Sequence, residues 1–173
     1  MCASGKIPGI FCRTGAVLLF LTVFAWPGRA QEPDIPVFDF SGIRPFLEQT
    51  DDTTYLINFW ATWCTPCVEE MPAINEIARK YRDRKLSILL VSLDFPTHIE
   101  TRVIPFIREH RLIPRVVVLD DPDADRWIRE VSSRWSGAIP ATLIYRNEKR
   151  DFYEKSFTYQ ELETIVKLKL DQP

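Results

Sequence analysis

Cys64 and Cys67, two cysteines separated by two residues, have the spacing in this chain that most directly implies chemistry. At that spacing the two sulfur atoms are within reach of each other and can alternate between a disulfide and two thiols. The other cysteines, Cys2 and Cys12, lie among the first thirty residues, so no framework of structural disulfides is indicated. The pair predicts thiol–disulfide exchange with protein thiols, in which the disulfide carries the electrons and no bound cofactor is needed.

The two cysteines lie at the start of a predicted helix. Residues 53–60 are rich in β-branched and aromatic side chains, which predicts a buried strand, and residues 65–82 show helical periodicity. Cys64 therefore lies where free N–H groups and the helix dipole stabilise a thiolate. Cys67 begins the apolar stripe of this helix. We expect Cys64 to be exposed and to attack a substrate disulfide, and Cys67 to be covered and to resolve the mixed disulfide.

Thr65 and Pro66 form the loop between the two cysteines. A proline is tolerated in the first turn of a helix and stiffens the loop. The loop does not fix the direction of electron flow, because the reduction potential also depends on the surrounding charges.

The remaining pattern of the chain predicts a single α/β domain over residues 31–173. Strands and helices alternate first, and a hairpin and a final helix capped by Thr158 follow. This order implies a mixed central sheet with helices on both faces. After the first helix, the expected strands lie at 86–93, 115–119, 141–145 and 152–157, and the expected helices at 97–111, at 124–133 and from 158. Pro105 is expected to bend or break the helix at 97–111.

The first thirty residues differ in kind from the rest. Lys6 and Arg13 precede an uncharged apolar run over 15–26, and small residues lead up to Ala30. This order predicts a signal peptide cleaved after Ala30, and hence export to the periplasm or to the outer face of the cytoplasmic membrane. An uncleaved membrane anchor is the alternative, although the run is shorter than the roughly 20 residues that a membrane-spanning helix needs.

Three segments together resemble the TlpA/ResA-like branch of the thioredoxin superfamily. They are FWATWCTPC at 59–67, EEMP at 69–72 and IPAT at 139–142. The resemblance covers residues from about 38 to the C-terminus, and it implies a thioredoxin fold with a helical insertion around 97–111. It also implies an exported protein that reduces protein disulfides, for instance in cytochrome c maturation, with electrons from a membrane thiol transporter.

The resemblance also assigns roles to three further residues. Pro140 matches the family's cis-proline, which packs against the redox pair, and the backbone of Ile139 would pair with the substrate chain. Glu70 matches an acidic residue that tunes the cysteine pKa values and handles protons. Apart from the resemblance, we expect Trp60 and Trp63 to pack at the flanks of the site, with Trp63 partly exposed beside Cys64 at the substrate-binding surface.

The role of Glu70 has a simpler alternative. Thioredoxins carry a buried Asp on the strand before the motif, where this chain has Asn58, which cannot take a proton. Glu70 is therefore the better candidate for a proton acceptor. On the sequence alone, however, Glu69 and Glu70 could equally be two solvated acids on a helix surface.

Other functions need residues that this chain lacks. A zinc site needs four ligands, and only His98 and His110 are available beside the pair, so no metal site is expected. Copper delivery is the best alternative without catalysis, because two thiolates suit Cu(I). Superfamily copper chaperones, however, space their cysteines more widely and add a distal His. A peroxiredoxin would normally have no second cysteine in a C-x-x-C motif. The net charge of −2 argues against nucleic acid as a binding partner.

Overall fold

The computed structural model describes residues 1, 5 and 34–171 of the chain. The expected signal peptide, residues 1–30, falls almost entirely outside the described residues and stays a prediction. In the part of the chain that the structure describes, no helix is both long and apolar enough for a membrane crossing.

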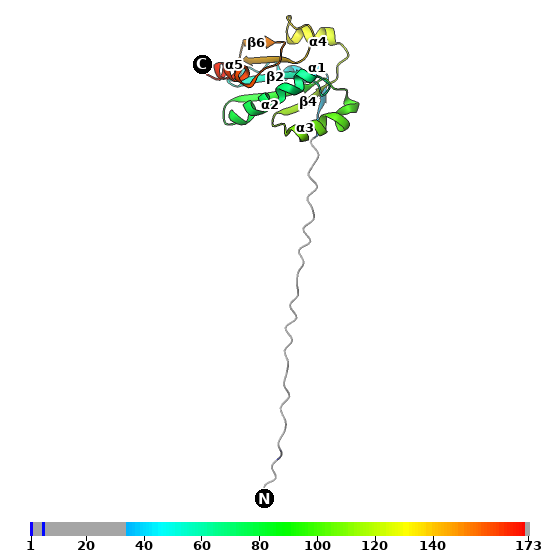
Figure 1. The fold of residues 1–173 in the computed structure, drawn as a ribbon, viewed down its shortest axis with the longest axis vertical. Coiled ribbons are helices and arrows are strands. Elements are labelled where there is room, and N and C mark those ends of the chain that lie inside the picture. The colour runs from blue at the N-terminus through cyan, green and yellow to red at the C-terminus, as the bar shows by residue number, and fades with distance from the viewer. Residues whose placement is uncertain (2–4, 6–33, 172–173) are drawn as a thin grey trace. The chain divides into compact units, whose positions relative to one another are not determined.

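The core of the domain is one mixed sheet of six strands in the order β1-β4-β3-β2-β5-β6 (Figure 1). The central strand β2 pairs in parallel with β3 and antiparallel with β5. It is buried along almost its whole length, as its apolar sequence predicts. The strands are β1 (Val37–Phe38), β2 (Thr54–Trp60), β3 (Leu86–Ser92), β4 (Arg115–Leu119), β5 (Ala141–Arg146) and β6 (Lys149–Tyr153).

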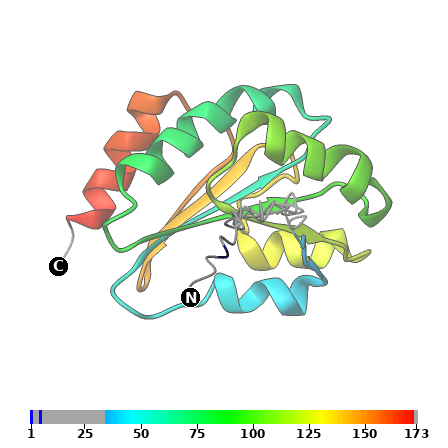
Figure 2. The same ribbon diagram turned by 90° about the horizontal axis from the view of Figure 1, so that it is seen from below.

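Helices cover both faces of this sheet, as the order of elements predicts (Figure 2). One face packs against α2 (Thr65–Lys80), α3 (Ile104–His110) and α5 (Tyr159–Leu170) and forms the larger apolar core. The other face packs against α1 (Phe40–Ile43) and α4 (Ala124–Val131) and forms a second core rich in aromatic rings. The sheet thus holds the start of α2 rigidly at one end of β2.

The insertion around 97–111 is helical but not one regular helix. A 3₁₀ turn at Pro96–His98 leads into a π-helical turn at Ile99–Val103, and α3 follows. Pro105 lies in the first turn of α3, where a proline's missing N–H is tolerated. The chain stays helical from the π-helical turn into α3, so the segment changes helix type just before Pro105 and does not break there as we expected.

The terminal hairpin differs from the prediction in its second strand. We expected a strand at 152–157, but β6 spans Lys149–Tyr153. Asn147 adopts a positive φ of 51°, so the chain turns tightly and Lys149 already pairs with Arg146. Residues 154–157 leave the sheet and run toward the start of α2, and the expected cap of α5 at Thr158 is confirmed.

Candidate active site

The cysteine pair lies where the sequence predicts it, at the junction of β2 and α2. Cys64 is the N-cap residue of α2, with extended backbone angles, and its Sγ accepts a hydrogen bond from the N–H of Cys67 at 3.3 Å. The two cysteines form a disulfide, with their Cα atoms 5.3 Å apart. A thiolate at Cys64 would receive the same N–H bond and the favourable end of the helix dipole.

The burial of the two sulfurs corrects one expectation. Cys64, which we expected to be exposed, is only 6% exposed in the disulfide form, and Cys67 is fully buried. The reason is the loop before Pro140, because the carbonyl oxygen of Ile139 lies 3.6 Å from the Sγ of Cys64. Cys64 is still the more accessible of the two.

The peptide bond between Ile139 and Pro140 is cis, as the resemblance implies. Pro140 is buried, and Ile139 is half-buried between the two apolar cores. A reduced Cys64 thiol can donate a hydrogen bond to the Ile139 carbonyl. The structure therefore brings together the cysteine and the backbone segment that were predicted to meet the substrate.

An exposed rim surrounds Cys64. Trp63 is 58% exposed, as expected, and Thr65 and Pro66, which follow Cys64 in the chain, are exposed as well. A large exposed aromatic ring next to a reactive sulfur gives a docking protein apolar area to bury.

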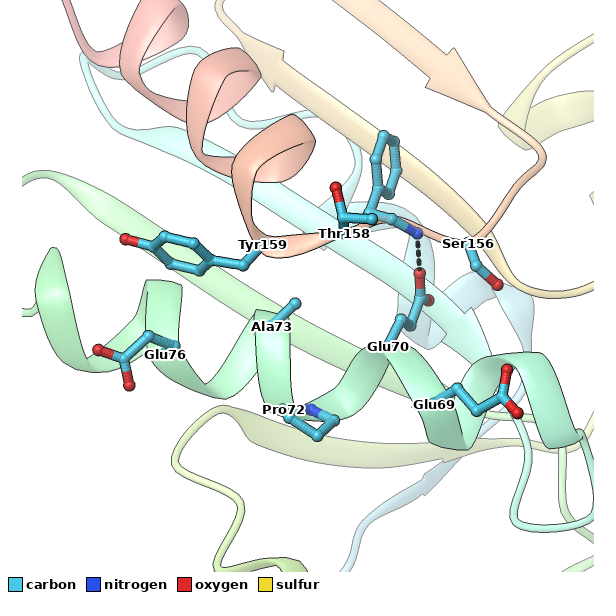
Figure 3. A pocket seen from close by; sticks show the side chains of 9 residues that line it. Glu69, Glu70, Pro72, Ala73, Glu76, Ser156, Thr158 and Tyr159 are labelled. Carbon is cyan, nitrogen blue, oxygen red and sulfur yellow. Dashed lines mark hydrogen bonds between the residues drawn. The ribbon is translucent and has the colours of Figure 1, made fainter.

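Glu70 is a buried acid and not a solvated one. Its side chain is 2% exposed, whereas Glu69 beside it is exposed. The carboxylate accepts hydrogen bonds from the Phe157 N–H at 3.0 Å (Figure 3) and from Asn58 Nδ2 at 2.8 Å. Loss of water on burial outweighs these two bonds and raises the pKa of Glu70 to about 7. The carboxyl can therefore exchange a proton near neutral pH.

The hydrogen-bond network around Glu70 includes Asn58 and Thr142, which were not predicted as site residues. Asn58 Nδ2 donates to Glu70 and also to the Oγ1 of Thr142, at 3.0 Å, on the neighbouring strand. Asn58 and Thr142 face each other in the pairing of β2 with β5. An amide inside an otherwise apolar strand is the signal that could have revealed this network.

A cavity of about 530 Å³ opens beside Glu70, between the first turns of α2 and the segment that leads into α5 (Figure 3). Glu70 points from α2 toward that segment and is one of the residues that line the cavity. The lining residues are Glu69, Glu70, Pro72, Ala73, Glu76, Ser156, Phe157, Thr158 and Tyr159.

A second buried acid holds the loop before the motif. Asp94, 1% exposed, accepts hydrogen bonds from the N–H and the Oγ1 of Thr62, at 2.9 and 2.6 Å. The Ser92 hydroxyl donates to the same carboxylate at 2.8 Å. Sequence reasoning missed Asp94, because only the pairing of β2 with β3 brings residues 62 and 94 together.

The described residues contain no group of three or more His, Cys, Asp or Glu side chains that could hold a metal ion. The two histidines contact aromatic rings instead: His98 meets Phe95, and His110 stacks on Phe106. Within the described residues no further ligand joins Cys64 and Cys67, so nothing beyond the cysteine pair itself supports the zinc or the copper alternative.

Comparisons with known proteins agree with this site. The AhpC/TSA family model matches residues 31–150. The chain is 30% identical over 139 residues to the thiol-disulfide oxidoreductase ResA of a Bacillus cereus strain, covering 78% of this chain and 75% of that one. It is also 37% identical over 76 residues to the thioredoxin-like protein YneN of Bacillus subtilis (strain 168), and this match spans only 44% of either chain.

Solved structures show the same fold. A thioredoxin-related protein from Neisseria meningitidis serogroup B aligns with a TM-score of 0.61 at 20% identity, over 73% of this chain and 91% of that one. A secreted thiol-disulfide isomerase from Corynebacterium glutamicum aligns with a TM-score of 0.58 at 16% identity, over 70% and 73% of the two chains. The chain has a thioredoxin fold and belongs to the AhpC/TSA family, among the thiol–disulfide oxidoreductases related to ResA.

Proposed function

We propose that this chain reduces disulfide bonds in other proteins, with Cys64 as the attacking and Cys67 as the resolving cysteine. The observation that carries the proposal is the Cys64–Cys67 disulfide at the N-terminus of α2, beside the backbone of Ile139 and one helical turn from the buried acid Glu70. The name of the relative ResA, a thiol-disulfide oxidoreductase, supports the class of reaction.

The reaction begins with the reduced pair. The Cys64 thiolate attacks one sulfur of the substrate disulfide, which breaks the substrate's S–S bond and forms a mixed disulfide. The released substrate sulfur takes up a proton. Cys67 then attacks the sulfur of Cys64, which frees the second substrate thiol and leaves the Cys64–Cys67 disulfide. Two electrons pass from the pair to the substrate, and no bound cofactor takes part.

Glu70 would serve the second step. Cys67 is a poor nucleophile until it loses its proton, and its fully buried position disfavours the thiolate. Glu70 follows Cys67 by one turn on the buried side of α2, and its pKa of about 7 lets it take up a proton at neutral pH. Its cavity then connects the proton to solvent.

The substrate would be a polypeptide that binds across the rim. The carbonyl of Ile139 beside Cys64 gives an extended chain a backbone group to pair with. Trp63, next to Cys64 in the chain, adds exposed apolar area. The oxidised pair must then be reduced again, and we propose a membrane thiol transporter as the electron donor.

We further propose that the domain works outside the cytoplasm, in the periplasm or on the outer face of the membrane. The predicted signal peptide supports this, and two structural neighbours are described as secreted. Cytochrome c maturation is a process in which such a reductant would be used.

The test uses the full chain and a protein disulfide such as insulin. Wild-type protein with dithiothreitol should accelerate insulin reduction, Cys64→Ser should lose this activity, and the double Cys64→Ser/Cys67→Ser variant is the matched blank. Cys67→Ser should accumulate a mixed disulfide, seen as a band of higher mass on a non-reducing gel. Activity that survives Cys64→Ser would show that the attacking cysteine is wrongly assigned.

A further inference from the structure

The loop that carries Ile139 is held in place by one carboxylate from outside it. Glu154 follows β6, and its Oε2 accepts the N–H of Ser136 at 3.1 Å, while its Oε1 accepts the N–H of Ala138 at 3.2 Å. The hydroxyl of Ser136 donates to the same carboxylate. A single side chain thus binds three donors of the loop.

This loop needs such an anchor because its own backbone is irregular. Gly137, between the two bound N–H groups, has a φ of 96°, a left-handed conformation that glycine adopts readily. β5 begins only at Ala141, so Ser136 and Ala138 lie outside the strand. On the other side the indole N–H of Trp135 donates to the Ala138 carbonyl at 2.8 Å. Glu154 therefore fixes the turn immediately before Ile139.

The residues after Glu154 hold the other half of the site. The Ser156 hydroxyl donates to the carbonyl of Pro66, inside the motif loop, at 3.1 Å. The Phe157 N–H donates to Glu70 at 3.0 Å. The four-residue segment 154–157 therefore binds the loop before Pro140, the motif loop and the buried acid, and sets the spacing between them.

We infer that Glu154 is a positioning residue that holds the Ile139 backbone in register for an extended polypeptide substrate. The inference rests on the proposed exchange function and adds a residue that sets the affinity for the polypeptide substrate, because only a chain that pairs with Ile139 gains from this register. A small disulfide needs only to reach the Cys64 sulfur. The hydrogen bonds from Ser136 also lower the pKa of Glu154, so the carboxylate stays charged around neutral pH.

The experiment compares two disulfides in single-turnover oxidation of the reduced full chain, followed by tryptophan fluorescence. One is a disulfide-bonded peptide and the other is dithiobis-nitrobenzoate, a small aromatic disulfide. In Glu154→Ala the peptide concentration for half-saturation should rise about tenfold, with little change in the limiting rate. The rate with the small disulfide and the reduction potential of the pair should stay unchanged.

Two further variants sharpen the result. Glu148→Ala removes an equal charge from the turn between β5 and β6 and should behave as the wild type with both disulfides. Glu154→Gln keeps one acceptor oxygen and should raise the half-saturation concentration less than Glu154→Ala does. The inference would be overturned if Glu154→Ala shifted the reduction potential of the pair or slowed the reaction with both disulfides equally. It would also be overturned if Glu154→Ala left the half-saturation concentration of the peptide unchanged. A wild-type chain that reacts with neither disulfide would overturn the proposed function itself.

Discussion

Replacement of Glu70 by glutamine should change how the stability of the oxidised domain depends on pH. The folded carboxyl has a pKa of about 7, against 4.5 for the free group, because burial disfavours its charge. Between these two values the folded chain holds a proton that the unfolded chain has released. Stability must therefore fall as the pH rises through this window, and the deficit is complete above about pH 7.

The size of the effect follows from the two pKa values. Each unit of difference corresponds to about 1.4 kcal/mol, so an ionised Glu70 costs the folded state about 3 kcal/mol at pH 8 relative to pH 4. Glu70→Gln has no charge to bury and should lack this fall. It also loses one acceptor oxygen for Asn58 or Phe157, which shifts its stability by a constant amount at every pH.

The assay is urea unfolding of both oxidised proteins, followed by tryptophan fluorescence at several pH values from 4 to 8. The other titrating groups are shared, so the free energy of unfolding of the wild type minus that of Glu70→Gln isolates residue 70. This difference should fall by about 3 kcal/mol across the window. A difference that stays constant with pH would refute the raised pKa and, with it, the proton-handling role.

Three further changes test the framework of the site. Asp94→Ala leaves the Thr62 N–H and hydroxyl without their acceptor and should lower the free energy of unfolding by about 2–3 kcal/mol in a urea titration; a loss below the error of the titration would contradict the anchoring role. Asn58→Asp places a second carboxyl against Glu70 and should steepen the fall of stability between pH 5 and 8, whereas an unchanged profile would show that the two groups do not interact. Thr158→Ala removes the side-chain cap of α5 and should cost about 1 kcal/mol in the same assay, with insulin reduction unaffected; a loss of activity at unchanged stability would be inconsistent with a purely structural cap.

Local signals in the sequence were enough to place the chemistry. A strand rich in β-branched residues, followed by a helical period, predicts Cys64 at the N-terminus of a helix, and the structure has it as the N-cap. The segment IPAT, read through the resemblance, predicts the cis bond before Pro140. The position of Cys64 follows from residues close together in the chain, and the cis bond follows from a motif that can be read directly.

Two of the features that were missed depend on contacts between distant segments. Cys64 is covered by the Ile139 carbonyl, 75 residues further along the chain, so its burial is not visible near the motif. Asp94 reaches Thr62 only through the pairing of two strands. β1 has only two residues and shows no alternation, and the end of β6 depends on the tight turn at Asn147. The burial of Cys64 and the contact of Asp94 are thus tertiary effects, whereas β1 and the turn at Asn147 are local features too short to show a hydrophobic period.

The combination of Asn58 with Glu70 explains how a buried acid can titrate near neutral pH. An isolated buried carboxyl would have a pKa raised far by desolvation, and a second carboxyl nearby would raise it further. Asn58 presents a neutral N–H donor at 2.8 Å, which favours the ionised form of Glu70 and adds no competing proton. The Phe157 N–H acts in the same direction. Both groups lower the pKa against desolvation, which leaves it at about 7. Asn58 on the strand therefore leaves Glu70 as the single titrating group of this pair, on the helix that carries Cys67, where the proposed second step of exchange would use it.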